Sequence, residues 1–178
     1  YGKHAYEIFV NRGYPADRFI TIGNPLFVDL NKYQSNVDLL YKKFEIDPSK
    51  NNILFTTSRY QGFSNNYNFD LLVWEELLKN FAHKSNFTLI LKSHPYEDIS
   101  LHESILLKYN RPTNVKILNG DILELIQISS LLVSSASTAI IDAMSLKIPA
   151  IELDWDGLNN MQFPSKEFSV PIRSNLTN

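Results

Sequence analysis

The sequence lacks cysteine altogether, has only 6 glycines in 178 residues, and carries a formal net charge of only -2. Without cysteine the chain can form neither a disulfide framework nor a thiolate metal site. Its near-neutral charge offers no basic field for a nucleic-acid backbone, which argues against that class of partner. The four histidines show no HExxH or similar ligand spacing, so we expect no metal: His4, His83, His94 and His102.

Long apolar runs are missing as well. None approaches the roughly 18–20 residues that span a bilayer, and no charged-then-apolar signal segment opens the chain. Hydrophobic residues make up 44% of the sequence and charged residues 20%, as in globular domains. Because the chain begins at Tyr1 rather than Met, we expect it to be a piece of a longer protein.

Regular secondary structure is predicted along most of the chain. Helical spacing covers residues 2–11, 37–44, 69–81, 99–109 and 121–128, and a further helix begins near Ser137. Apolar and β-branched runs predict strands at residues 18–22, 53–57, 87–91, 115–118, 131–133 and 150–153. From residue 52 onward the strands alternate with helices and are continuously apolar. This pattern predicts an α/β fold with a doubly wound, Rossmann-like parallel sheet covered on both faces.

The carboxyl ends of the predicted strands carry the polar residues of interest. In such sheets ligands bind in the crevice outside those ends. The segments 58–59, 92–95 and 134–138 each come directly after a strand, so we expect all three to meet at one edge of the sheet. The loop at 58–66 is long and polar, which is unusual for a simple connector.

The segment 131–151 reads as a strand, a hydroxyl-rich turn, a helix and a second strand. Its turn contains Ser134, Ser135, Ser137 and Thr138. Hydroxyls and backbone N–H groups at a helix start suit an anion, and a phosphate is the obvious candidate. The simpler alternative is that these residues only cap the helix, a role that Ser and Thr fill in many proteins.

Three basic or titratable side chains accompany that turn. His94 follows a strand and precedes a proline, where it could donate to a phosphate or stabilise charge on a departing nucleotide. Otherwise it is a surface histidine at the start of a turn. Arg59 and Lys92 could add positive charge at the same edge, or be ordinary solvated residues.

Acidic residues are harder to assign. Asp142, one turn into the helix near Ser137, could accept hydrogen bonds from ribose hydroxyls, or could simply be an acid that the helix dipole stabilises. Glu97 and Asp98 are expected to begin or cap the next helix, and Asp154 and Asp156 follow the last strand. The chain has no GxSxG elbow, no GxGxxG and no Walker A sequence, so a Ser–His–Asp, dinucleotide or P-loop mechanism has no support.

Three segments give the chain a family resemblance. Residues 12–25 (RGYPADRFITIGNP) look like the lead-in to the interdomain linker of two-Rossmann-domain (GT-B) glycosyltransferases. Residues 92–95 (KSHP) are similar to the His-Pro motif of bacterial sialyltransferases and of glycerophosphotransferases that make teichoic acid. Residues 129–149 resemble their shared donor-phosphate segment, with Asp142 where many relatives have Glu.

The resemblance implies a C-terminal, nucleotide-sugar-binding half of a GT-B enzyme for bacterial surface or capsular polysaccharide. His94 would contact the donor phosphate or leaving nucleotide, and the substrate-binding residues would be Arg59, Lys92, Ser134, Ser135, Ser137, Thr138 and Asp142. No metal or cofactor is implied besides the CMP-, CDP- or UDP-linked donor. A glycan or lipid-linked acceptor would bind a missing N-terminal domain, so this piece alone would be inactive. The expected location is cytoplasmic or at the inner membrane face.

The resemblance also implies domain boundaries. Residues 1–50 would lead from the missing domain, 51–155 would bind the donor, and 156–178 would form a tail. Two alternatives remain open: a CDP-polyol phosphotransferase or UDP-amino-sugar epimerase of the same fold, and a non-catalytic Rossmann-like assembly module.

Overall fold

The computed structural model describes residues 2–22, 36–57, 69–135 and 137–153, and forms two compact units that divide between Ser35 and Asn36. Several expectations fall outside these residues, among them Arg59 and its loop, the Gly-Asn-Pro sequence at 23–25, Asp154 and Asp156. Residues 36–50, which the sequence groups with the N-terminal segment, belong to the second unit.

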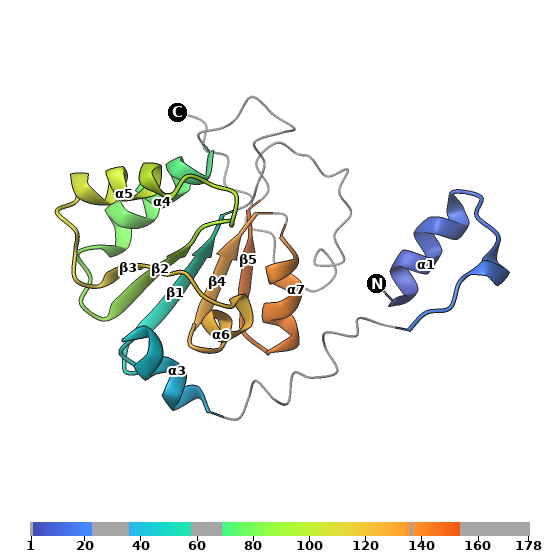
Figure 1. The fold of residues 1–178 in the computed structure, drawn as a ribbon, viewed down its shortest axis with the longest axis horizontal. Helices are drawn as coiled ribbons and strands as arrows, with labels where there is room; N and C mark the ends of the chain where they lie inside the picture. The colour runs from blue at the N-terminus through green and yellow to red at the C-terminus, as the bar shows by residue number, and fades with distance from the viewer. Residues whose placement is uncertain (1, 23–35, 58–68, 136, 154–178) are drawn as a thin grey trace. The chain divides into compact units, whose positions relative to one another are not determined.

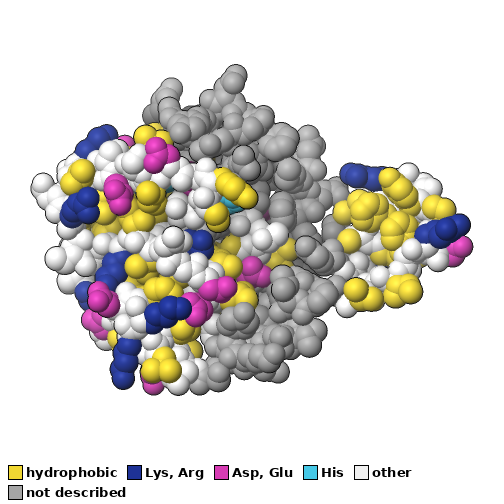
Figure 2. Space-filling view, viewed as in Figure 1, with side chains coloured by type: hydrophobic (Ala, Val, Ile, Leu, Met, Phe, Trp, Pro, Cys, Tyr) yellow, Lys and Arg dark blue, Asp and Glu magenta, His cyan; other side chains and the backbone are white. Residues whose placement is uncertain are grey.

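The first unit is held by aromatic side chains. Helix α1 (Gly2–Asn11) ends shortly before Gly13, whose φ of 89° is the left-handed conformation common after helices. The Phe9 ring stacks on Phe19 with 5.5 Å between the ring centroids, and it meets Tyr14 edge-on with 5.6 Å between the centroids. Hydrophobic side chains gather on the visible face of this unit (Figure 2), and Phe9, Tyr14, Ile20 and Ile22 are exposed.

The predicted strand at 18–22 is wrong. A 3-10 helix, η1 (Ala16–Arg18), occupies its start, and residues 19–22 have no regular structure. A strand needs a neighbour for its N–H and C=O groups, and none of the described strands pairs with this segment. The β-branched composition therefore gave a misleading signal, because pairing partners decide whether such a run becomes a strand.

The second unit is built on a five-stranded parallel sheet, as predicted (Figure 1). Its strands lie in the order β3-β2-β1-β4-β5, and their bounds are β1 (Asn51–Thr56), β2 (Phe87–Lys92), β3 (Val115–Ile117), β4 (Leu131–Ser134) and β5 (Ala150–Glu152). The helices are α3 (Val37–Phe44), α4 (Phe69–Phe81), α5 (Ile99–Lys108), α6 (Ile122–Gln127) and α7 (Thr138–Ser145). The predicted helices and the remaining strands are thus confirmed to within a few residues.

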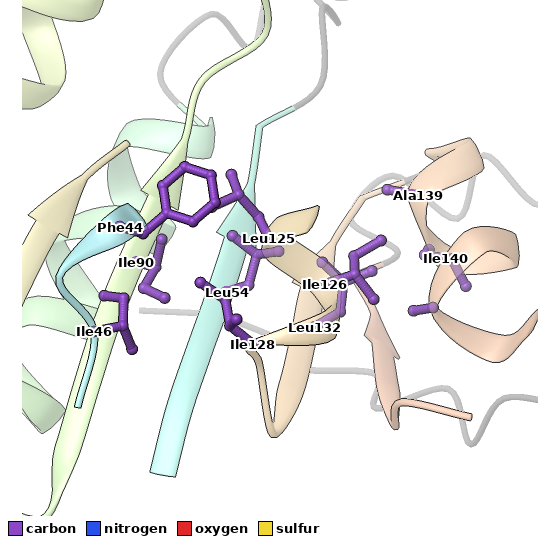
Figure 3. Close-up of a cluster of buried hydrophobic side chains, with 11 residues drawn as sticks. Phe44, Ile46, Leu54, Ile90, Leu125, Ile126, Ile128, Leu132, Ala139 and Ile140 are labelled. Carbon is purple, nitrogen blue, oxygen red and sulfur yellow. The ribbon is translucent and has the colours of Figure 1, made fainter. Parts of the chain in front are cut away.

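Each face of the sheet has its own core, because successive strand side chains point to opposite faces. Leu54, Ile90 and Leu132 pack with α3, α6 and α7, as Figure 3 shows. Ile53, Phe55 and their neighbours on β2 pack instead with α4 and α5. Burial on both faces explains why the strands read as continuous apolar runs.

Buried polar side chains join the core to its loops. The Asn114 amide donates to the carbonyls of Phe81, Lys84 and Phe87, which fixes the turn between α4 and β2. The Trp74 indole stacks near Phe55 and donates to the His102 carbonyl at 3.2 Å, which ties α4 to α5. These bonds satisfy groups that would otherwise be costly to bury.

We predict that two leucines on the same helix, α4, respond very differently to truncation. Leu78→Ala removes a side chain that is 0% exposed and should lower the free energy of unfolding by about 2–5 kcal/mol. Leu72 is 52% exposed, so Leu72→Ala should change it by less than about 0.5 kcal/mol. Urea denaturation of both variants tests this, and equal losses would contradict the assignment of the core.

Candidate functional site

The sheet reverses its winding direction between β1 and β4. From β1 the chain proceeds outward through β2 and β3, whereas β4 and β5 lie on its other side. In doubly wound sheets ligands bind at this switch point, outside the carboxyl ends of the strands. The register brings two of the predicted segments, 92–95 and 134–138, to the two sides of β1, because Thr56 pairs with both Lys92 and Ser134. The third, 58–59, lies outside the described residues.

Ser134 joins the two strands at the switch point. The Thr56 hydroxyl donates to Ser134 Oγ at 2.6 Å, and Ser134 Oγ lies 3.3 Å from the Thr56 carbonyl oxygen. Both side chains are buried, and Ser134 is 0% exposed. The Ser134 hydroxyl is therefore engaged inside the sheet, and its predicted contact with a substrate remains a prediction.

The hydroxyl-rich turn continues from Ser134 into α7. Ser137 caps this helix, since its Oγ accepts the Ala139 N–H at 3.2 Å. Ser135 is buried, with its hydroxyl 3.5 Å from Asp70 Oδ1 on α4, and Thr138 is exposed at the first turn. The capping role of Ser137 is thus present, and the predicted binding of an anion by Ser135, Ser137 and Thr138 stays a prediction.

His94 begins a tight turn after β2. The Glu97 N–H donates to the His94 carbonyl at 2.9 Å, which closes a four-residue turn that has Pro95 at its second position. Inside the turn the Tyr96 N–H donates to His94 Nδ1 at 3.3 Å. Since Nδ1 then acts as the acceptor, the ring proton is assigned to Nε2, which becomes a hydrogen-bond donor.

The His94 turn is tied to the central strand. The His94 N–H donates to Thr57 Oγ1 at 2.8 Å and lies 3.2 Å from Glu97 Oε2, while the Thr57 hydroxyl donates to that same carboxylate oxygen. Lys92 contributes its carbonyl, which accepts the Thr57 N–H at 3.2 Å. The Lys92 side chain is partly exposed at this edge.

Two adjacent acids, one at the end of the turn and one just after it, differ in role. Asp98 caps α5, as predicted, by accepting the Ser100 N–H at 3.0 Å. The expectation for Glu97 is wrong, because its carboxylate bonds back to Thr57 and to the His94 N–H instead of to the helix. Sequence spacing gave no signal for this contact, since Thr57 is 40 residues away along the chain.

Asp142 lies partly buried on α7. Burial raises the pKa of its carboxyl, and the negative charge of Asp121 raises it further. Asp121 itself caps α6 by accepting the N–H groups of Leu123 and Glu124. The neighbouring acid follows from the packing of α6 beside α7, which the sequence did not reveal.

Neither a metal site nor a membrane span is evident in the parts of the chain that the structure describes. No group of three or more His, Asp or Glu side chains could hold a metal ion there. None of the helices in those parts is long and apolar enough to cross a membrane.

The fold defines a Rossmann-like domain of the kind that forms the C-terminal half of GT-B glycosyltransferases. A family model for CDP-glycerol:poly(glycerophosphate) glycerophosphotransferases matches residues 3–159. The chain therefore belongs to this family, which confirms the GT-B resemblance. A comparison with curated proteins gives no match.

Solved structures share the fold at low sequence identity. The wall teichoic acid polymerase TagF is 20% identical with a TM-score of 0.57, over 92% of this chain and 40% of that one. UDP-GlcNAc 2-epimerase from Neisseria meningitidis is 20% identical with a TM-score of 0.66, over 87% and 43%. The corresponding enzyme from Methanocaldococcus jannaschii is 17% identical with a TM-score of 0.57, over 85% and 43%. The chain thus spans about two fifths of these relatives.

We predict that Asp142→Asn stabilises the protein at pH 7. Because the folded pKa is raised, the wild type loses stability as the pH rises from the ordinary value of 3.8 through the folded value. The neutral amide escapes this loss, so the advantage of the variant should grow over that interval and level off above it. Thermal denaturation from pH 3 to 8 measures the difference, and a constant offset at all pH values would contradict the electrostatic cause.

Proposed function

We propose that this chain is the donor-binding half of a transferase that uses a CDP-linked glycerol or related polyol to build a bacterial surface polymer. Membership of the glycerophosphotransferase family supports the choice of donor. The observation that carries the proposal is that the His94 turn and the start of α7 follow the two strands that flank β1, at the switch point of the sheet.

The chemistry would be phosphoryl transfer. An acceptor hydroxyl attacks the phosphorus that carries the glycerol, a new P–O bond forms, the anhydride bond breaks, and CMP leaves. Negative charge then builds on the phosphate of CMP, where a positioned N–H donor stabilises it. In our proposal His94 Nε2–H donates to this leaving group.

The remaining residues would hold the donor. Ser135, Ser137 and Thr138 would bind phosphate oxygens through hydroxyls and the N–H groups at the helix start, with Ser134 behind them. Lys92 and Arg59 would add positive charge. Asp142 would accept hydrogen bonds from the ribose. This role would explain why the chain has an acid at a position where burial disfavours the charged carboxylate.

The rest of the enzyme lies in the other half of the GT-B fold. We propose that residues 51–155 bind the donor, 1–50 lead from a preceding domain and 156–178 form a tail. The acceptor and the base that takes its proton would belong to that preceding domain, and the donor would serve without a metal. A cytoplasmic location at the inner membrane face would bring a lipid-linked acceptor within reach, and capsule is one polymer it could serve.

Two related activities share the same donor half: glycosyl transfer from a CMP-, CDP- or UDP-sugar, and UDP-amino-sugar epimerisation. The likeness in fold to the UDP-GlcNAc 2-epimerases supports epimerisation as an alternative activity. All three need a diphosphate or phosphate at the switch point. Preference for cytidine over uridine nucleotides would argue against the epimerase and against a UDP-sugar donor, and turnover of CDP-glycerol by the full-length enzyme would separate the CDP-polyol donor from CMP- and CDP-sugars.

We predict that CDP-glycerol and CDP bind at the switch point. Titration followed by amide NMR should shift the signals of residues 134–138 and 94–97 more strongly with CDP than with UDP. His94→Ala should weaken the affinity about 10- to 100-fold, as expected when a hydrogen bond to a charged group is lost.

The matched control is His83→Ala, because His83 is an exposed histidine in the turn before β2 and should leave the affinity unchanged. Absence of any shift at millimolar nucleotide would contradict the proposal. A non-catalytic assembly module would instead leave both affinity and activity unaffected by His94→Ala.

A further inference from the structure

Glu97 is the last residue of the turn that His94 begins, and its carboxylate faces two hydrogen-bond donors. It accepts hydrogen bonds from the Thr57 hydroxyl and from the His94 N–H. Thr57 directly follows β1, and His94 follows β2 by two residues. Thr57 is buried, with 5% of its surface exposed. A buried hydroxyl and a partly buried carboxylate that satisfy each other form a strong, charge-assisted contact.

We infer that Glu97 is a positioning residue: through Thr57 and the His94 N–H it fixes the orientation and the tautomer of the His94 imidazole. The inference rests on the proposed function for its consequence in binding, but not for its structural content. It assigns to Glu97 no contact with the substrate.

The link from the carboxylate to the ring runs through the turn. The carboxylate holds the first residue of the turn by its N–H, while the Glu97 N–H holds the His94 carbonyl. These two bonds place the Tyr96 N–H against His94 Nδ1. Because that donor occupies Nδ1, the proton stays on Nε2, the nitrogen that would meet the phosphate. Release of the carboxylate would loosen the turn and mix the two tautomers.

Helix α5 offers a matched comparison. Asp98 is the neighbouring acid, but it caps α5 through the Ser100 N–H and makes no described bond to the His94 turn. Asp98→Ala therefore removes a nearby carboxylate and a helix cap but leaves the bonds of the His94 turn intact. It serves as the control for Glu97→Ala. Thr57→Ser and Thr57→Val provide a second comparison, because only serine keeps the hydroxyl.

The experiment has a readout that does not need a ligand. Long-range ¹H–¹⁵N spectra of the histidine rings distinguish Nε2-protonated from Nδ1-protonated imidazole. Wild type, Asp98→Ala and Thr57→Ser should show His94 protonated at Nε2, whereas Glu97→Ala and Thr57→Val should show a mixture. An unchanged His94 signature in both of the latter variants would overturn the inference.

Nucleotide affinity supplies the second readout. Glu97→Ala should weaken CDP binding about fivefold, a size typical of coupled neighbours, and should add nothing in a His94→Ala background. An equal loss in both backgrounds would show a role independent of His94 and overturn the inference. If wild type binds no nucleotide, the proposed function fails, while the ring spectra still decide the role of Glu97. If Glu97→Ala does not fold, Thr57→Val and Glu97→Gln in the same two assays decide it.

Discussion

Two consecutive threonines at the end of the central strand hold the site together. Thr56 reaches β4 through the Ser134 hydroxyl, and Thr57 reaches the turn after β2 through Glu97 and the His94 N–H. β1 lies between β2 and β4 in the sheet, so two adjacent residues at its end can contact segments on both sides. The parallel register sets this arrangement, because it brings Lys92 and Ser134 to the same level on either side of Thr56.

This construction makes the edge of the sheet polar yet well ordered. A buried hydroxyl costs stability unless it is hydrogen-bonded, and the pairs around Thr56 and Thr57 meet that requirement. The apolar cores on the two faces of the sheet pack against these strands and so fix the positions of their ends. An anion site built on such a base would need little rearrangement when its ligand arrives.

The acidic residues around the site serve different purposes. Asp98 and Asp121 cap helices, where a carboxylate is favoured by the N–H groups and by the helix dipole. Asp142 has its charge opposed by burial and by Asp121. An acid in an unfavourable place is more informative about function than one in a favourable place, because stability alone does not explain it.

The sequence by itself determined the order of helices and strands in the sheet unit, the parallel sheet and the GT-B family resemblance. The elements could be predicted because apolar periodicity and caps such as Asp98 and Ser137 are local signals that act over a few residues, and the resemblance came from three short motif segments. It failed at residues 18–22, where a strand needs a partner that propensity cannot supply. Only the tertiary structure decided that Ser134 bonds to Thr56, that the charge of Asp121 acts on Asp142, and that Glu97 bonds to Thr57 across 40 residues. Those contacts depend on which strands become neighbours and in what register, and no spacing along the chain records that.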